Sequence, residues 1–254
     1  MSAISVFRRV EKKYRMDPAG MESLLPAIKE RMDEDSYCVG GNYYRICNLY
    51  FDTTRDDVIR ESLKKPFFKE KLRMRSYGYP ETEDSPVFLE LKRKVNGIVT
   101  KRRATLPYAA ALAFLDQGTI PEGLSYMNRQ VMREISAYLQ RHPIETGTLL
   151  TYERSAWFGR EDCDPGFRIT FDRNICCSRG VMDMNHEAAR PLLADDFILM
   201  EAKVEGAFPL WFSRLLAREK IRHQSFSKYG VAYKTWLKED RFEKDRTINV
   251  LGPI

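Results

Sequence analysis

The chain has 254 residues, 43% of them hydrophobic and 31% charged, so it is too apolar for a disordered protein and long enough to bury a sizeable core. Its 42 Lys and Arg exceed its 36 Asp and Glu by six, a modest excess that attracts an anionic ligand only where it is concentrated. The five cysteines form no CxxC pair and the three histidines are scattered, which argues against a structural zinc site and against histidine-dependent acyl transfer.

Eight segments alternate between apolar and polar residues and predict β-strands. In chain order they are Val6–Tyr14, Arg45–Phe51, Phe68–Tyr77, Val87–Lys94, Ile98–Thr105, Leu149–Phe158, Phe167–Ile175 and Phe197–Val204. Helical spacing predicts packing helices over Pro18–Met32, Thr53–Lys64, Pro107–Leu115, Ser125–Arg141 and Pro209–Ile221. Asn96-Gly97 between two strands is typical of an antiparallel hairpin, so we expect an α+β fold.

No repeat and no Pro/Gly/Ser-rich linker divides the chain. We therefore expect a single domain over residues 1–240 and a loose C-terminal tail over residues 241–254. No apolar run reaches the ~18 residues of a membrane span, and the N-terminus lacks the apolar core of a signal peptide. The expected location is the cytoplasm.

The predicted strands have one apolar and one charged face, because residues of like parity on a strand share a face. The charged faces collect Glu11, Lys13, Lys69, Lys71, Arg73, Arg75, Glu90, Lys92, Lys94, Lys101, Arg103, Tyr152, Arg154, Arg168, Thr170, Asp172, Glu201 and Lys203. A single strand of this kind is normally the solvated face of a sheet. Many together predict a closed antiparallel β-barrel of eight strands, with helices outside and a charged lumen.

A lumen lined with cations implies an anionic ligand, because like charges that are crowded and desolvated destabilise an empty site. Arginine matches phosphate oxygens bidentately and lysine supplies a point charge, so a chain of phosphates fits best. Arg73 and Arg75 are the strongest candidate ligands. Nucleic acid is disfavoured, since its binding usually requires an outward basic patch with aromatic platforms.

Eight short motifs occur along the chain. They are Arg9-Val-Glu-Lys-Lys-Tyr14, Asn48-Leu-Tyr-Phe-Asp-Thr53, Lys71-Leu-Arg-Met-Arg75, Leu89-Glu-Leu-Lys92, Tyr152-Glu-Arg154, Arg168-Ile-Thr-Phe-Asp172, Met200-Glu-Ala-Lys203 and Ser225-Phe-Ser-Lys-Tyr-Gly230. In this order they resemble the VTC domain, the catalytic module of the vacuolar transporter chaperone within the triphosphate tunnel metalloenzyme (CYTH-like) superfamily. The resemblance extends from about Phe7 to Tyr233.

This resemblance implies an eight-stranded triphosphate tunnel and a polyphosphate polymerase, an ATP:polyphosphate phosphotransferase that moves the γ-phosphate of ATP onto a growing chain and releases ADP. The catalytic cations that it implies are Lys13, Arg73, Arg75, Arg154, Arg168 and Lys228. The substrate-binding residues expected from the resemblance and the charged faces are Lys71, Lys92, Lys101, Arg103, Tyr152, Lys203 and Ser227.

The resemblance also implies a Mn²⁺ or Mg²⁺ ion held by Glu201, with Glu11 or Glu90 as further ligands. An internal ion pair of Glu201 with Lys203 is the alternative interpretation. The superfamily signature Glu-x-Glu-x-Lys begins here with Arg9, which favours the polymerase branch over the hydrolytic relatives with two carboxylates.

Two residues near these motifs have a structural alternative. Asp172 is expected to orient an arginine rather than to bind metal. Ser225 or Ser227 could cap a helix, and only the resemblance identifies the neighbouring Lys228 as a ligand.

Two other functions stay open at this point. One is a tripolyphosphatase or nucleoside triphosphatase, which would use water as the acceptor in the same tunnel. The other is a non-catalytic sensor of polyphosphate or inositol polyphosphate. Because the related eukaryotic domain is tethered to a membrane channel, a separate membrane partner that places the protein at the inner face of a membrane is a further hypothesis.

Overall fold

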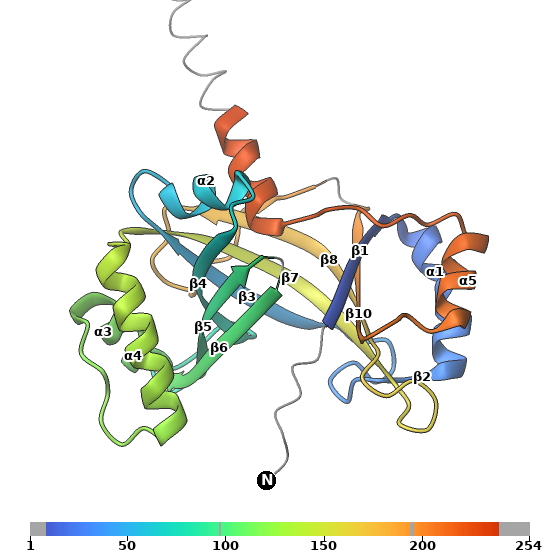
Figure 1. Cartoon of the computed structure of the whole chain (residues 1–254), viewed down its shortest axis with the longest axis horizontal. Coiled ribbons are helices and arrows are strands. Elements are labelled where there is room, and N and C mark those ends of the chain that lie inside the picture. The colour runs from blue at the N-terminus through green and yellow to red at the C-terminus, as the bar shows by residue number, and fades with distance from the viewer. Residues whose placement is uncertain (1–8, 97, 194–195, 239–254) are drawn as a thin grey trace, which may run out of the picture.

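The computed structural model describes residues 9–96, 98–193 and 196–238 and is built around one curled antiparallel sheet (Figure 1). Its main strands follow the spatial order β1-β10-β8-β7-β3-β4-β5-β6, so β1 and β6 are the two edges of a half-barrel. The strands are β1 (Arg9–Met16), β3 (Tyr44–Asp52), β4 (Phe68–Tyr77), β5 (Pro86–Val95), β6 (Ile98–Pro107), β7 (Thr146–Gly159), β8 (Arg168–Arg179) and β10 (Ile198–Glu205). The predicted α+β class with eight antiparallel strands is confirmed, whereas closure is not seen, because β1 and β6 are not paired with each other in the described structure.

Two short strands and five labelled helices accompany the main strands. β2 (Met32–Glu34) pairs with β7, and β9 (Arg190–Pro191) pairs with β8. Both are too short to produce a detectable alternation in the sequence. The helices are α1 (Pro18–Arg31), α2 (Asp57–Leu63), α3 (Tyr108–Gln117), α4 (Tyr126–Arg141) and α5 (Leu210–Arg218). All five lie within the segments that were predicted or within two residues of them.

The apolar face of the sheet is convex and is covered by two pairs of helices on opposite sides (Figure 1). α3 and α4 pack through Phe114, Ile135 and Tyr138 on the strands from β3 to β6. α1 and α5 pack through Ile28 and Phe212 on β1, β8 and β10. Burial of these side chains is the main stabilising contribution, and it fixes which strand face points inward.

A further helix over residues 228–238 covers one end of the concave face, together with α2 (Figure 1). Tyr229 and Trp236 from this helix pack with Ile46, Leu150 and Leu199, which lie on the inward faces of β3, β7 and β10. No helix was predicted over this segment from hydrophobic spacing, but Ser225 or Ser227 was a candidate helix cap. The helix begins directly after Ser227.

Asp52 at the end of β3 joins this helix to α2. Its buried carboxylate accepts hydrogen bonds from the backbone amides of Val58 and Ile59 at 2.9 Å and from the Tyr229 hydroxyl at 2.6 Å. The ring of Tyr229 also stacks on Tyr50, with centroids 4.8 Å apart. One carboxylate thus holds both the first turn of α2 and the first turn of the C-terminal helix.

Replacing Tyr229 with phenylalanine is expected to lower the free energy of unfolding by about 1.5–3 kcal/mol, the usual contribution of a hydrogen bond to a charged group. Urea unfolding at neutral pH measures this loss. Tyr126→Phe is the matched control, because Tyr126 is 80% exposed on α4. A loss in Tyr229→Phe no larger than that in Tyr126→Phe would show that the hydroxyl does not hold the helix.

No described helix combines the length and the apolar character needed to cross a membrane. The tail predicted over residues 241–254 lies outside the described residues.

Candidate functional site

The antiparallel register explains how the charged residues of separate strands come together on the concave face. Lys13 lies opposite Glu201 across β1 and β10, and Glu11 lies opposite Lys203. On the other side of the half-barrel, three rows each join β4, β5 and β6. They are Lys69, Lys94 and Val99; Lys71, Lys92 and Lys101; and Arg73, Glu90 and Arg103. The predicted charged faces therefore meet on the concave face of the half-barrel, which we call the groove.

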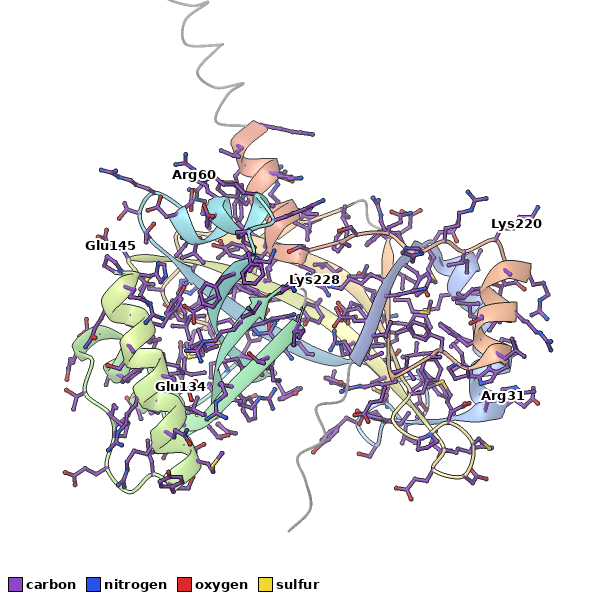
Figure 2. All side chains as sticks on the ribbon, in the orientation of Figure 1. Arg31, Arg60, Glu134, Glu145, Lys220 and Lys228 are labelled. Atoms are coloured by element: carbon purple, nitrogen blue, oxygen red, sulfur yellow. The ribbon has the colours of Figure 1, made fainter. Side chains whose placement is uncertain are left out.

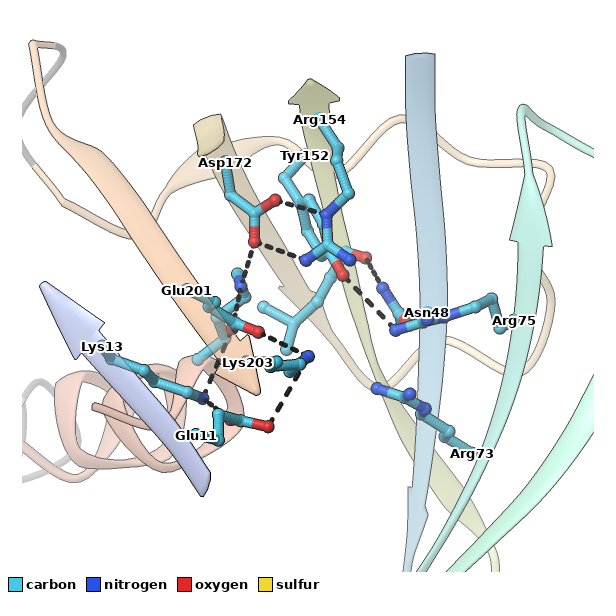
Figure 3. A network of polar contacts seen from close by, with 12 residues as sticks. Glu11, Lys13, Asn48, Arg73, Arg75, Tyr152, Arg154, Asp172, Glu201 and Lys203 are labelled. Carbon is cyan, nitrogen blue, oxygen red and sulfur yellow. Dashed lines mark hydrogen bonds and ion pairs between the residues drawn. The ribbon is translucent and has the colours of Figure 1, made fainter. Parts of the chain in front are cut away.

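One wall of the groove, on β1 and β10, alternates lysines with carboxylates (Figure 3). Lys203 Nζ lies 3.2 Å from a Glu201 oxygen and 3.5 Å from a Glu11 oxygen. Lys13 Nζ lies 3.4 Å from both carboxylates. Burial alone would raise the pKa of Glu201, but the charges of Lys228, Lys13 and Lys203 hold it well below its ordinary value. Glu201 is therefore ionised at neutral pH.

Deeper in the same wall, Asp172 of β8 is buried between two cations. Arg154 of β7 donates to it through Nε at 2.6 Å and Nη2 at 2.8 Å, and Lys228 Nζ donates to the second oxygen at 2.5 Å. Lys228, at the start of the C-terminal helix near the centre of the molecule (Figure 2), also lies 3.3 Å from Glu201. Asp172 thus orients an arginine, as predicted, and it also orients Lys228.

The opposite wall is centred on Glu90 of β5, which is fully buried. Its carboxylate accepts hydrogen bonds from Arg73 at 2.6 Å, from Arg103 at 2.7 Å and from Lys101 at 2.8 Å. Burial alone would raise the pKa of Glu90, but Arg73 and Arg75 keep it far below its ordinary value. Glu90 therefore lies apart from the pair Glu11 and Glu201, and its three bonded cations occupy both of its oxygens.

Arg75, Lys71 and Lys92 are among the groove cations that have no carboxylate within ion-pairing distance in the described part of the chain. Arg75 bonds only neutral groups, the Asn48 side-chain oxygen at 2.8 Å and the Tyr152 hydroxyl at 3.4 Å. Lys71 and Lys92 face each other across β4 and β5, and burial is the main cause that lowers the pKa of each. Figure 3 shows Arg73 and Arg75 extending toward the carboxylate wall. Arg75, Lys71 and Lys92 are therefore available to bind an anion.

β8 adds two polar atoms that are buried without a partner in the described structure, Arg168 Nε and Thr170 Oγ1. Both residues lie on the strand face of Asp172, and their neighbours across β10 are Lys203 and Glu201. A buried donor without an acceptor is destabilising, and a ligand oxygen in the groove would satisfy it. Arg168 was predicted as a ligand, whereas Thr170 was noted only as part of the charged face.

Two groups of the groove titrate near neutral pH. Burial and neighbouring lysines lower the pKa of Lys71 to about 8. Burial would raise the pKa of Tyr50, but Arg73 and Arg75 lower it to about 8, and Arg73 Nη1 donates to its oxygen at 2.9 Å. As the pH rises through this value, Lys71 loses a positive charge and Tyr50 gains a negative one, so both changes oppose anion binding.

We therefore expect the affinity for inorganic triphosphate to fall by roughly tenfold between about pH 7 and pH 9, beyond the change caused by titration of the ligand itself. Lys71→Arg stays charged over this range, so the affinity of the wild type relative to this variant isolates the contribution of Lys71. Isothermal titration calorimetry at several pH values measures both. A ratio that does not change with pH would exclude Lys71 from the binding site.

The carboxylates present fit an oxygen-ligated divalent ion only in part. Among the described residues, no three Asp, Glu, Cys or His side chains are arranged to hold a metal. Glu11 and Glu201 lie diagonally across β1 and β10, and both share Lys13 and Lys203. Mg²⁺ and Mn²⁺ are often held by one or two carboxylates together with substrate phosphates. These two residues suit such an ion if phosphate groups supply the remaining ligands.

Sequence reasoning missed the neutral residues that position the cations. Asn48 and Tyr50 share the inward face of β3 with the apolar Ile46, and each accepts a hydrogen bond from an arginine. The sequence did carry a signal for them, because each is a polar residue at an inward-facing position of a strand that is otherwise mainly apolar. Ser227, predicted to contact substrate, caps the C-terminal helix by accepting from the Gly230 amide at 3.2 Å.

Comparison with known proteins gives a match to one family model and several similar solved structures. The VTC domain family model matches residues 8–237. No curated protein matches the chain. Similar solved structures include a candidate adenylate cyclase from Bacillus halodurans, 15% identical over 86% of this chain and 93% of that one, with a TM-score of 0.49. Another, from Vibrio parahaemolyticus, is 12% identical over 89% and 98%, with a TM-score of 0.46. The family match spans every strand of the curled sheet.

Proposed function

The chain belongs to the VTC domain family, and from this premise we propose that it is a metal-dependent phosphotransferase that extends inorganic polyphosphate with the γ-phosphate of ATP. The observation that supports the proposal is the set of cations without carboxylate partners, Arg75, Lys71 and Lys92, facing a wall that offers Glu11 and Glu201. A linear polyanion suits the cations of β4 and β5, and a metal ion bound to phosphate suits the carboxylates of β1 and β10.

Phosphoryl transfer depends mainly on positioning and on neutralisation of charge, and the groove offers both. Arg75, Lys71 and Lys92 would bind non-bridging phosphate oxygens. Arg73 is held in one orientation by Glu90 and Tyr50, so its guanidinium is preorganised for the transferring group. The terminal oxygen of the acceptor chain is already anionic. It attacks the γ-phosphorus, the bond to the β-phosphate oxygen breaks, and ADP leaves without a general base.

Glu201 and Glu11 would hold the Mg²⁺ or Mn²⁺ ion, whose chemistry is to neutralise charge on the triphosphate oxygens. Lys13, Lys203 and Lys228 now neutralise these carboxylates. When phosphates enter, the same lysines can turn to phosphate oxygens and leave the carboxylates free for the metal. The scarcity of histidine in the chain agrees with this mechanism, which requires no proton transfer.

The test is incubation of the purified chain with ATP and either Mg²⁺ or Mn²⁺, with ADP, orthophosphate and long-chain polyphosphate measured together. We expect polyphosphate to form in the same amount as ADP, counted in phosphate units. Orthophosphate without polymer would make the protein a hydrolase. Tight binding of polyphosphate with neither product would make it a sensor.

Arg75→Gln is expected to weaken the binding of inorganic triphosphate by about 10- to 100-fold, because it removes a charge-assisted contact to phosphate. Arg133→Gln is the matched control, since Arg133 is exposed on α4, on the convex side of the sheet. Equal affinities of the two variants, measured by calorimetry without metal, would place the phosphate chain away from Arg75.

A further inference from the structure

The tip of the β5–β6 hairpin and the adjoining start of β4 carry apolar side chains that stay exposed. Phe68, Val95 and Ile98 are neighbours in register across the three strands and are 49%, 40% and 62% exposed. Phe67 precedes them and is also exposed, as is Val99 after them. Single exposed apolar residues are normal on a protein surface, but here three form a row on the convex face, Val99 lies in the adjacent row on the concave face and Phe67 directly precedes β4, so both faces of the tip are apolar.

On the convex side, α4 contacts this part of the sheet through ion pairs of Glu134 with Arg93 at 2.7 Å and with Arg102 at 2.9 Å, and of Arg141 with Glu70 at 2.9 Å. Arg93 and Glu70 each lie two residues from the row of Phe68, Val95 and Ile98. Phe68 also lines a pocket beside α2 and the end of α4, and it stays half exposed. The described structure leaves the patch open to solvent.

The surroundings of the tip are cationic. The segment from Lys64 to Lys69 reads KKPFFK, and the segment from Lys92 to Arg103 reads KRKVNGIVTKRR, with no Asp or Glu in either. Lys69 and Lys94 form the next row on the concave face, and neither has a carboxylate partner among the described residues. Long lysine side chains can extend toward lipid headgroups while a neighbouring apolar group enters the acyl boundary.

We propose that this tip, which we call the hairpin tip (Phe67, Phe68, Val95, Ile98 and Val99 with Lys64, Lys65, Lys69 and Lys94), docks on an anionic lipid surface. The charge complementarity selects the occupant. Lys69 and Lys94 have no carboxylate partner among the described residues, and Lys64 pairs with the exposed Glu61, so the tip has an excess of positive charge that suits a surface of acidic headgroups. An apolar row at the end of a hairpin is suited to shallow insertion, whereas protein interfaces are usually broader. The inference does not depend on the phosphotransferase activity.

Flotation of the full chain with vesicles tests the proposal. We expect binding to vesicles of phosphatidylcholine mixed with phosphatidylserine, little binding to phosphatidylcholine alone, and weaker binding as salt is raised. The double variant Phe68→Ser, Ile98→Ser should bind about 10- to 100-fold more weakly, and Lys65→Gln roughly fivefold more weakly. Tyr126→Ser, which removes an exposed aromatic ring on α4, should bind as the wild type does.

Inorganic triphosphate in excess separates the hairpin tip from the groove, which is itself cationic. Vesicle binding that persists in triphosphate and is lost in the double variant supports the proposal. Binding that triphosphate abolishes, or that the double variant retains, would assign the lipid contact to the groove and overturn it. Absence of vesicle binding, with self-association that the double variant abolishes, would identify the tip as a contact between two copies of the chain instead.

Discussion

Glu201→Gln is expected to lower the rate of polyphosphate synthesis by about 100- to 1000-fold, the usual effect of removing one preorganised electrostatic group from a catalytic site. Glu201 is buried and ionised, and it contacts Lys13, Lys203 and Lys228 at 3.2–3.4 Å. The amide keeps the shape of the side chain but removes the charge that would hold a divalent ion. ADP release and polyphosphate formation, followed over a range of metal concentrations, measure the effect.

The binding of triphosphate without metal distinguishes a catalytic role of Glu201 from a structural one. Removal of this carboxylate frees its lysines, so the variant should bind metal-free triphosphate at least as tightly as the wild type does. Glu22→Gln is the matched control, because Glu22 is exposed on α1. Full activity in Glu201→Gln would exclude Glu201 as the metal ligand. Loss of both activity and metal-free binding would indicate collapse of the groove.

Asp172→Ala is expected to lower the free energy of unfolding by about 3–5 kcal/mol. Asp172 is fully buried and neutralises Arg154 and Lys228, so its removal leaves Arg154 desolvated without a counter-ion and Lys228 with Glu201 alone. Asp33→Ala removes a carboxylate of the same type from an exposed pair with Arg160 and should change stability by only about 0–1 kcal/mol. Urea unfolding of both variants at neutral pH gives the comparison. Equal losses would contradict the network.

The pH dependence of this stabilisation follows from the sign of the pKa shift. Burial would raise the pKa of Asp172, but the charges of Arg154 and Lys228 lower it below the ordinary value of 3.8. The unfolded chain therefore binds a proton at higher pH than the folded chain does. The contribution of Asp172 is fully present above its unfolded pKa, and it is lost as the pH falls through the lower folded value. The difference in stability between wild type and Asp172→Ala should shrink in the same range.

The strands were predictable because each one has two chemically distinct faces. Leu72 and Met74 alternate with Arg73 and Arg75, so these residues are assigned to the same faces wherever the strand is predicted to begin or end. The direction of the charged faces followed from the same pattern, since the apolar faces need helices to cover them. β2 and β9 offered no such pattern, because two or three residues cannot define a period.

The partners of each charge were not predictable. Glu90 was a candidate metal ligand because it is a carboxylate on one of the predicted charged strand faces. In the fold it lies between Arg73 and Arg103, which join it only through the register of three strands. The contribution of Tyr50, which orients Arg73, depends on the same register. Sequence parity gives the face of a residue, whereas long-range pairing decides its contacts.

The lysines of the carboxylate wall carry their counter-ions on the same protein. Any incoming anion must displace a carboxylate that is tethered beside its lysine and so acts at high effective concentration. A chloride ion exchanges one such contact and cannot compete with it. A chain of phosphates can replace several lysine–carboxylate contacts, because the phosphates already bound hold the rest of the chain near the next lysine. Glu11, Glu201 and Asp172 thus make this wall selective for multivalent anions over the abundant monovalent anions of a salt solution.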